Sequence, residues 1–115
     1  MRTLLLAAIA AMTTVAAHAD NELPQLGCGG EDAGLRSLNA DTPTYVTFRN
    51  DTGRTVRTYW LNYKGRRVFY AEVPPGTSYV QQTYVTHPWV ITNNPSGDCV
   101  AVFMPAPSAA SAHIR

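Results

Sequence analysis

Short runs of β-branched and aromatic residues, each bounded by turn-forming residues, fill the sequence from Thr44 onward. Val, Thr, Tyr, Phe and Trp favour strands, whereas Gly, Pro, Asn and Asp interrupt them. No stretch of this region shows the apolar period of an amphipathic helix. The pattern therefore predicts an all-β sandwich or barrel of about six or seven short strands. The predicted strands are 44–49, 55–63, 68–73, 78–84, 89–92 and 99–103.

The N-terminal region has a different character. Arg2 precedes an apolar run that ends before Thr13 and is too short to span a bilayer, and Ala17-His18-Ala19 is a small-x-small cleavage site. These features predict a signal peptide over residues 1–19 and a secreted or periplasmic mature protein without a transmembrane segment. A membrane anchor is the weaker alternative, because nothing extends the apolar run.

The charge balance excludes one class of partner. The chain of 115 residues carries nine Lys and Arg against eight Asp and Glu, and cleavage would remove Arg2, which leaves a formally neutral protein. A neutral surface gives no electrostatic reason to bind nucleic acid or an acidic membrane. We therefore expect no nucleic acid as a partner.

Two cysteines, Cys28 and Cys99, are the only ones in the chain. In an exported protein they most simply form a disulfide, which would tie the glycine-rich segment before the domain to the last predicted strand. The chain-entropy model values such a bridge at about 4 kcal/mol. A metal site or a reactive thiol would need ligands or a basic residue nearby in the sequence, and neither cysteine has them.

Composition divides the remainder of the chain. Residues 20–34 contain Pro24 and several glycines without a hydrophobic period, which predicts a flexible N-terminal lead-in. Structure is expected over residues 35–105. Residues 106–115 have little apolar bulk, and we predict that they form a disordered tail.

Alternation within two predicted strands separates their side chains into two faces. If the odd-numbered set forms the core, Trp60 and Tyr70 point to the opposite face. Large aromatic residues there either cover a second cluster or line a binding groove, and the pattern leaves both readings open. The odd-numbered set is Tyr59, Leu61, Tyr63, Phe69, Ala71 and Val73.

A series of short motifs runs in order from Leu35 to Trp89. The motifs are Leu35-Arg36-Ser37-Leu38-Asn39, Val46-Thr47-Phe48-Arg49-Asn50, Tyr59-Trp60-Leu61-Asn62-Tyr63, Tyr70, Pro74-Pro75-Gly76-Thr77, Thr83-Tyr84 and His87-Pro88-Trp89. Their order and nearly ungapped spacing resemble the β domain of the von Hippel-Lindau tumour suppressor family. The likeness continues more loosely to Pro105.

This resemblance implies a small β sandwich of about seven short strands that binds a peptide whose proline is hydroxylated at C4. It implies a pocket with Trp60, Tyr70 and Trp89 as flat apolar walls for the proline ring. By the same resemblance, Thr83 and His87 supply hydrogen bonds to the ligand hydroxyl. The residues expected nearer the rim are Tyr84, Gln82 and Asn39.

The sequence departs from the family pattern at the pocket. Thr83 replaces a serine and adds a methyl group that could narrow the pocket, and Pro88 replaces a leucine and biases His87 towards extended backbone. Gln82 replaces a histidine and Asp41 an arginine, so we expect a different preference for the residues flanking the proline. We expect no helical α domain of the family in this protein and therefore no ubiquitin-ligase role.

Two other functional classes are alternatives. A structural or assembly domain would pack its aromatic face on a partner protein. Aromatic platforms also suit carbohydrate binding, although the acidic and amide residues expected beside them are missing. No spacing of Ser, His, Asp, Cys or paired carboxylates suggests a catalytic site. We expect no enzyme activity, no cofactor and no metal.

Overall fold

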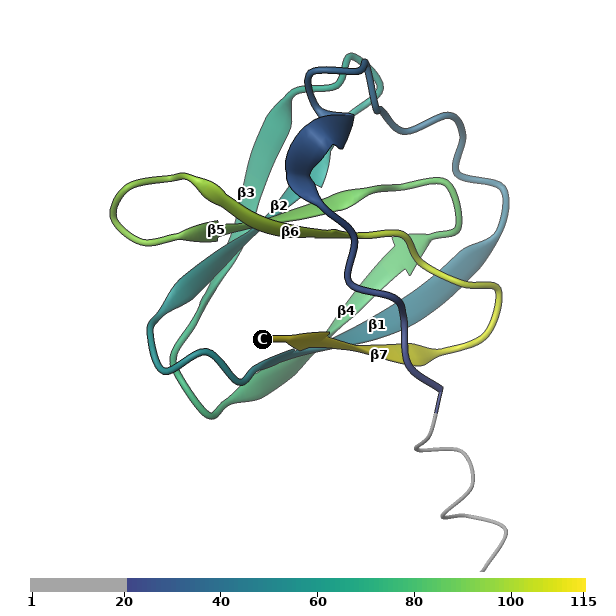
Figure 1. Ribbon diagram of the computed structural model, residues 1–115. Helices are drawn as coiled ribbons and strands as arrows, with labels where there is room; N and C mark the ends of the chain where they lie inside the picture. The colour runs from purple at the N-terminus through teal and green to yellow at the C-terminus, as the bar shows by residue number, and fades with distance from the viewer. Residues whose placement is uncertain (1–20) are drawn as a thin grey trace, which may run out of the picture.

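The computed structural model describes residues 21–115, so the predicted signal peptide lies outside the described residues. Within them, two facing β-sheets form a sandwich, and the prediction of an all-β fold is confirmed (Figure 1). One sheet has the strand order β4-β1-β7 and the other β3-β2-β5-β6. The strands are β1 (Pro43–Asn50), β2 (Val56–Leu61), β3 (Arg67–Val73), β4 (Ser78–Tyr84), β5 (Trp89–Asn93), β6 (Cys99–Phe103) and β7 (Ala110–Ile114).

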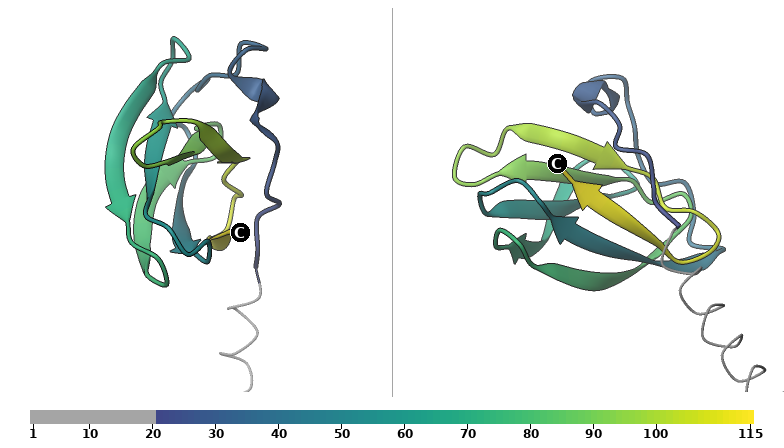
Figure 2. Two further views of the ribbon diagram at one scale, coloured as in Figure 1. Left: turned by 60° about the vertical axis from the view of Figure 1, so that its left-hand side comes forward. Right: turned by 60° about the horizontal axis from the view of Figure 1, so that its bottom comes forward.

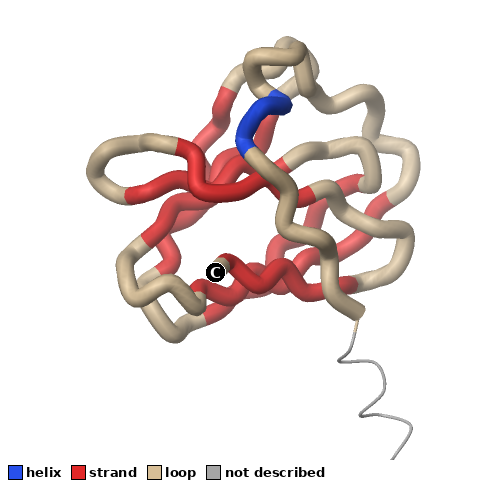
Figure 3. Tube along the Cα trace, viewed as in Figure 1, coloured by secondary structure: helices blue, strands red, loops and turns tan. Residues whose placement is uncertain are grey.

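The helical content of the described part of the chain is one short 3₁₀ turn, η2 (Cys28–Gly30), the blue segment in Figure 3. No helix among residues 21–115 has the length and apolar character needed to cross a membrane. The predicted bounds of β4 and β6 coincide with the observed ones, and the other predicted strands agree within two residues.

The prediction of a disordered C-terminal tail is wrong. Residues 110–114 form β7, which pairs in parallel with β1, and Ala112 and Ile114 are fully buried. The segment lacks bulk, but its alternate residues Ala112 and Ile114 point into the main core. Figure 2 shows β7 lying along the edge of its sheet.

The prediction of a flexible N-terminal lead-in is wrong, because the segment is hydrogen-bonded to the sandwich. The Leu23 amide donates to Ser111 O at 2.8 Å, and the Leu26 and Val102 backbones exchange two hydrogen bonds of 2.9 and 3.1 Å. Leu23 is buried in the main core. The segment therefore joins β7 to β6 across the opening between the two sheets, where it passes in front of both in Figure 1.

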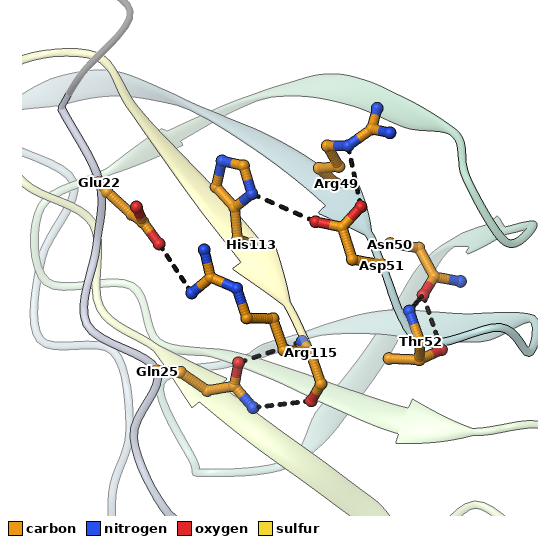
Figure 4. Close-up of polar contacts among 8 residues, drawn as sticks. All are labelled: Glu22, Gln25, Arg49, Asn50, Asp51, Thr52, His113 and Arg115. Atoms are coloured by element: carbon orange, nitrogen blue, oxygen red, sulfur yellow. Dashed lines mark hydrogen bonds and ion pairs between the residues drawn. The ribbon is translucent and has the colours of Figure 1, made fainter.

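Polar side chains of β7 and of the residue after it make further contacts with neighbouring segments (Figure 4). His113 Nδ1 lies 3.2 Å from an Asp51 carboxylate oxygen, and Arg115 forms an ion pair of 3.0 Å with Glu22. The predicted disulfide between Cys28 and Cys99 is present and links η2 to β6. The two ends of the described chain are therefore held by covalent and non-covalent contacts.

Asn50, at the end of β1, is fully buried and uses its whole side-chain amide. Its Nδ2 donates to Arg54 O at 2.6 Å and to Val73 O at 2.8 Å. Its Oδ1 accepts from the amide and the hydroxyl of Thr52, also drawn in Figure 4. These four bonds fix the turn between β1 and β2 and attach it to the end of β3.

A register shift in β2 and β3 changes the two faces expected from alternation. The partner of Thr58 is Ala71 and that of Tyr59 is Phe69, so Tyr70 is an extra, bulged residue. Trp60 packs against the main core between the sheets, whereas Leu61 belongs to a separate small cluster with Val90 and Val102. A core made of the odd-numbered set is therefore found only in part, because Val73 lies in the main core whereas Leu61 does not and Trp60 packs against that core.

Candidate functional site

A cavity of about 250 Å³ opens between β3 of one sheet and β4 of the other. Both strands are edge strands, so the cavity lies where the two sheets part. Its lining is mostly aromatic, with one histidine, one threonine and one glutamine. The lining residues are Trp60, Tyr63, Tyr70, Gln82, Thr83, Tyr84, His87 and Trp89.

Trp89 and Thr83 form the buried part of this cavity. The indole Nε1 of Trp89 donates to Thr83 Oγ1 at 2.9 Å, and both side chains are almost fully buried. A hydroxyl oxygen that accepts this bond still carries a hydrogen of its own to donate. The threonine hydroxyl is thus oriented by Trp89 and can donate to an oxygen inside the cavity.

Trp60 forms a second wall and is held from outside the cavity. Its Nε1 donates to Ser37 Oγ at 2.8 Å, and Ser37 Oγ donates in turn to Leu61 O at 2.6 Å. Ser37 is fully buried. This chain of hydrogen bonds fixes the indole plane, so the wall is preformed.

His87 stacks on Trp60 with ring centroids 5.1 Å apart and an interplanar angle of 26°. Burial lowers the pKa of His87 below its ordinary value of 6.5, and a hydrogen bond to the Asn39 backbone opposes this shift without cancelling it. The imidazole is therefore neutral at pH 7. Its Nε2 lies 3.1 Å from the hydroxyl of Tyr63.

Tyr70 and Tyr63 stand at the mouth of the cavity and are 46% and 45% exposed. The Tyr70 ring meets Trp89 edge-to-face with centroids 4.9 Å apart, and the bulge in β3 directs it there. Gln82 and Tyr84 line the β4 side, where Gln82 Nε2 donates to Thr83 O at 2.6 Å.

The structure brings together all but one of the residues expected at the pocket. Asn39 is exposed outside the lining, where its backbone exchanges hydrogen bonds of 3.1 and 2.8 Å with the Thr86 hydroxyl. The cavity is open with threonine at position 83, and the carbonyl of Pro88 accepts a hydrogen bond from the Leu61 amide at 3.0 Å.

Sequence reasoning missed two contributors to the site. Tyr63 follows the end of β2, so strand alternation placed it with Leu61 although its ring meets Trp60 edge-to-face at 5.6 Å. Ser37 lies before the first strand, and its contact with Trp60 spans residues far apart in sequence. The sequence did contain a signal for Ser37, because the motif Leu35–Asn39 resembles the family. The resemblance gave Ser37 no role in the pocket.

Comparison with protein families agrees with this geometry. The VHL beta domain model matches residues 35–105, which is more than half of the chain. That domain is a non-catalytic binding domain, and in VHL it binds hydroxyproline peptides. The β sandwich agrees with this match, and the chain belongs to the VHL beta domain family.

Proposed function

We propose that this protein is an exported module that binds peptides containing hydroxyproline, or rich in proline, in the cavity of Trp60, Thr83, His87 and Trp89. The observation that carries this proposal is the Thr83 hydroxyl. It is buried, it accepts from Trp89 at 2.9 Å, and its own hydrogen remains available. A polar group placed in this way favours a ligand with a matching oxygen.

The cavity suits the two parts of a hydroxyproline ring. Trp60, Tyr70 and Trp89 offer flat apolar surfaces to the ring carbons. The C4 hydroxyl would accept from Thr83 and donate to the neutral His87. Unhydroxylated proline contacts the same walls but leaves the polar groups of Thr83 and His87 unpaired. Each unpaired group makes the binding free energy less favourable by about 1 to 3 kcal/mol.

The strands beside the cavity support an extended ligand. The backbone edges of β3 and β4 carry no neighbouring strand in the described part of the chain. An extended peptide gains main-chain hydrogen bonds when it runs along such an edge. The disulfide between Cys28 and Cys99 supports export, because such bridges persist in oxidising compartments.

Titration of the oxidised protein with two peptides tests the proposal. The peptides share one sequence and differ only in proline or 4-hydroxyproline, and the fluorescence of Trp60 and Trp89 is the readout. We expect a saturable response to the hydroxylated peptide, at least tenfold weaker binding of the plain one, and loss of binding in His87→Ala.

Val80→Ala is the control variant, since Val80 is 64% exposed on β4 and lies outside the cavity. It should bind like the unmodified protein. If neither peptide changes the fluorescence, the cavity does not bind such ligands. The aromatic residues would then serve an assembly domain that packs on a partner protein.

A further inference from the structure

A second and wider cavity, of about 570 Å³, lies on the outer face of β2 and β3. Tyr59 and Phe69 form its aromatic walls, with ring centroids 5.7 Å apart, and Phe69 is 53% exposed. Arg57 and Glu72 frame it as an ion pair of 2.8 Å. The guanidinium of Arg57 also sits 5.8 Å from the centroid of the Phe69 ring.

Tyr70 joins this outer slot to the inner cavity, because it lines both. It can do so since β3 is an edge strand and Tyr70 is its bulged residue. Phe69 precedes it in the chain and points outward with Tyr59, whereas Tyr70 contacts Trp89. A ligand that crosses the edge of the sheet at Tyr70 therefore meets aromatic surface on both sides.

We propose that the slot of Tyr59 and Phe69 binds a second proline of the same peptide, three residues from the one in the inner cavity. This inference rests on the proposed function. In an extended peptide residues three apart lie about 10 Å from each other, and their side chains point to opposite faces, as the two cavities on either side of β3 require. Aromatic-lined grooves recognise prolines in other peptide-binding domains.

The charges of the slot favour an uncharged ligand group. Arg57 donates to Glu72 through both Nε and Nη2, so the cation and the anion satisfy each other. The pair leaves no unbalanced charge to attract an acidic or a basic side chain. An apolar ring that stacks on Phe69 and Tyr59 gains contact area without breaking this pair.

Four hydroxyproline peptides of equal length test the second subsite. The peptides differ only at the two positions that lie three residues before and three residues after the hydroxyproline. One peptide has glycine at both positions, one has proline only before, one has proline only after, and one has proline at both. The readout is affinity by calorimetry. We expect at least one proline position to strengthen binding by about fivefold, as for a partly buried ring.

Phe69→Ser is the decisive variant, because Phe69 is exposed and its replacement should leave the fold intact. It should remove the gain from the second proline and leave the affinity for the glycine-flanked peptide unchanged. Val80→Ser is the matched control, and it should keep the gain.

The outcomes separate the two proposals. If the glycine-flanked peptide binds but no second proline strengthens binding, or if the gain survives Phe69→Ser, the second subsite is overturned and the proposed function stands. If no peptide binds, both are overturned. A monomer–dimer equilibrium abolished by Phe69→Ser, without any effect on peptides, would assign the slot to a second copy of the chain instead.

Discussion

The hydroxyl of Tyr63 lies 3.1 Å from Nε2 of His87, at the mouth of the aromatic cavity. His87 also forms a hydrogen bond with the Asn39 backbone. Tyr63 therefore competes with a ligand hydroxyl for Nε2 of the imidazole. Tyr63 is 45% exposed, and its ring can move aside when a ligand enters. Ligand binding therefore includes the exchange of one hydrogen bond for another.

Replacing Tyr63 by phenylalanine should strengthen binding of a hydroxyproline peptide. The change removes the competing hydroxyl and keeps the ring that meets Trp60 at 5.6 Å. A net hydrogen bond of about 0.5 to 1.5 kcal/mol corresponds to a gain of about two- to tenfold in affinity. Calorimetric titration measures it, with the plain proline peptide as the control. Equal gains for both peptides would mean that Tyr63 acts through shape rather than through its hydroxyl.

Position 83 should decide both stability and selectivity. Thr83→Val keeps the shape but leaves the buried Trp89 indole without its acceptor, which should cost about 1 to 3 kcal/mol of unfolding free energy. The same variant should lose its preference for hydroxyproline over proline. Thr83→Ser retains the hydroxyl and should keep that preference. Urea unfolding and paired titrations provide the two measurements, and a selective valine variant would contradict this role of Thr83.

The stability of the protein should fall as the pH drops below 6.5 because of His87. Its pKa is lowered by burial in the fold and is ordinary in the unfolded chain, so the unfolded state takes up the proton first. The contribution is fully present above pH 6.5 and declines as the pH falls through the lower folded pKa. Urea unfolding at pH 7.5 and pH 5 should show a difference that is smaller in His87→Gln. An unchanged difference would assign the pH dependence to other groups.

Reduction of the disulfide should lower stability by about 4 kcal/mol, since the bridge joins residues 71 positions apart. The thermal unfolding midpoint of the oxidised protein should fall when dithiothreitol is added. A variant with serine at both Cys28 and Cys99 should unfold at the lower midpoint with or without the reductant. If oxidised and reduced proteins unfold at the same temperature, the contacts of the N-terminal segment suffice to hold it.

Truncating Ile114 should destabilise the sandwich, in contrast to what a disordered tail would show. Ile114 is fully buried in the main core, and Ile114→Ala should cost about 2 to 5 kcal/mol. His113→Ala, at the neighbouring outward position of β7, should cost much less because it loses only an exposed contact with Asp51. Urea unfolding of the pair measures the difference, and similar small losses would show that β7 contributes little.

The sequence predicted the strands best where bulky β-branched and aromatic residues alternate with clear turns. Residues 78–84 and 99–103 show this, and both strands have the predicted bounds. Strand β7 was not recognisable because Ala110, Ser111 and Ala112 carry little hydrophobic signal. Its stability comes from pairing with β1 and from the buried Ile114, and neither is a local property.

The candidate site was predictable as a set of residues but not as a geometry. Family motifs indicated the walls and the polar groups, whereas alternation alone left the environment of Trp60 open. The bulge at Tyr70 reverses the face of the residues that follow, and a regular strand pattern cannot show it. The bond between Tyr63 and His87 likewise depends on how the chain turns after β2.

The bond between Trp89 and Thr83 also has a consequence for how such a protein can diversify. These residues belong to the buried interior and to the cavity at once, so changes there alter folding. Tyr63, Tyr70 and Phe69 are half exposed, and substitutions at such positions cost little stability. A set of variants that differ only at these rim residues can therefore change which ligand sequence is preferred while the fold stays intact.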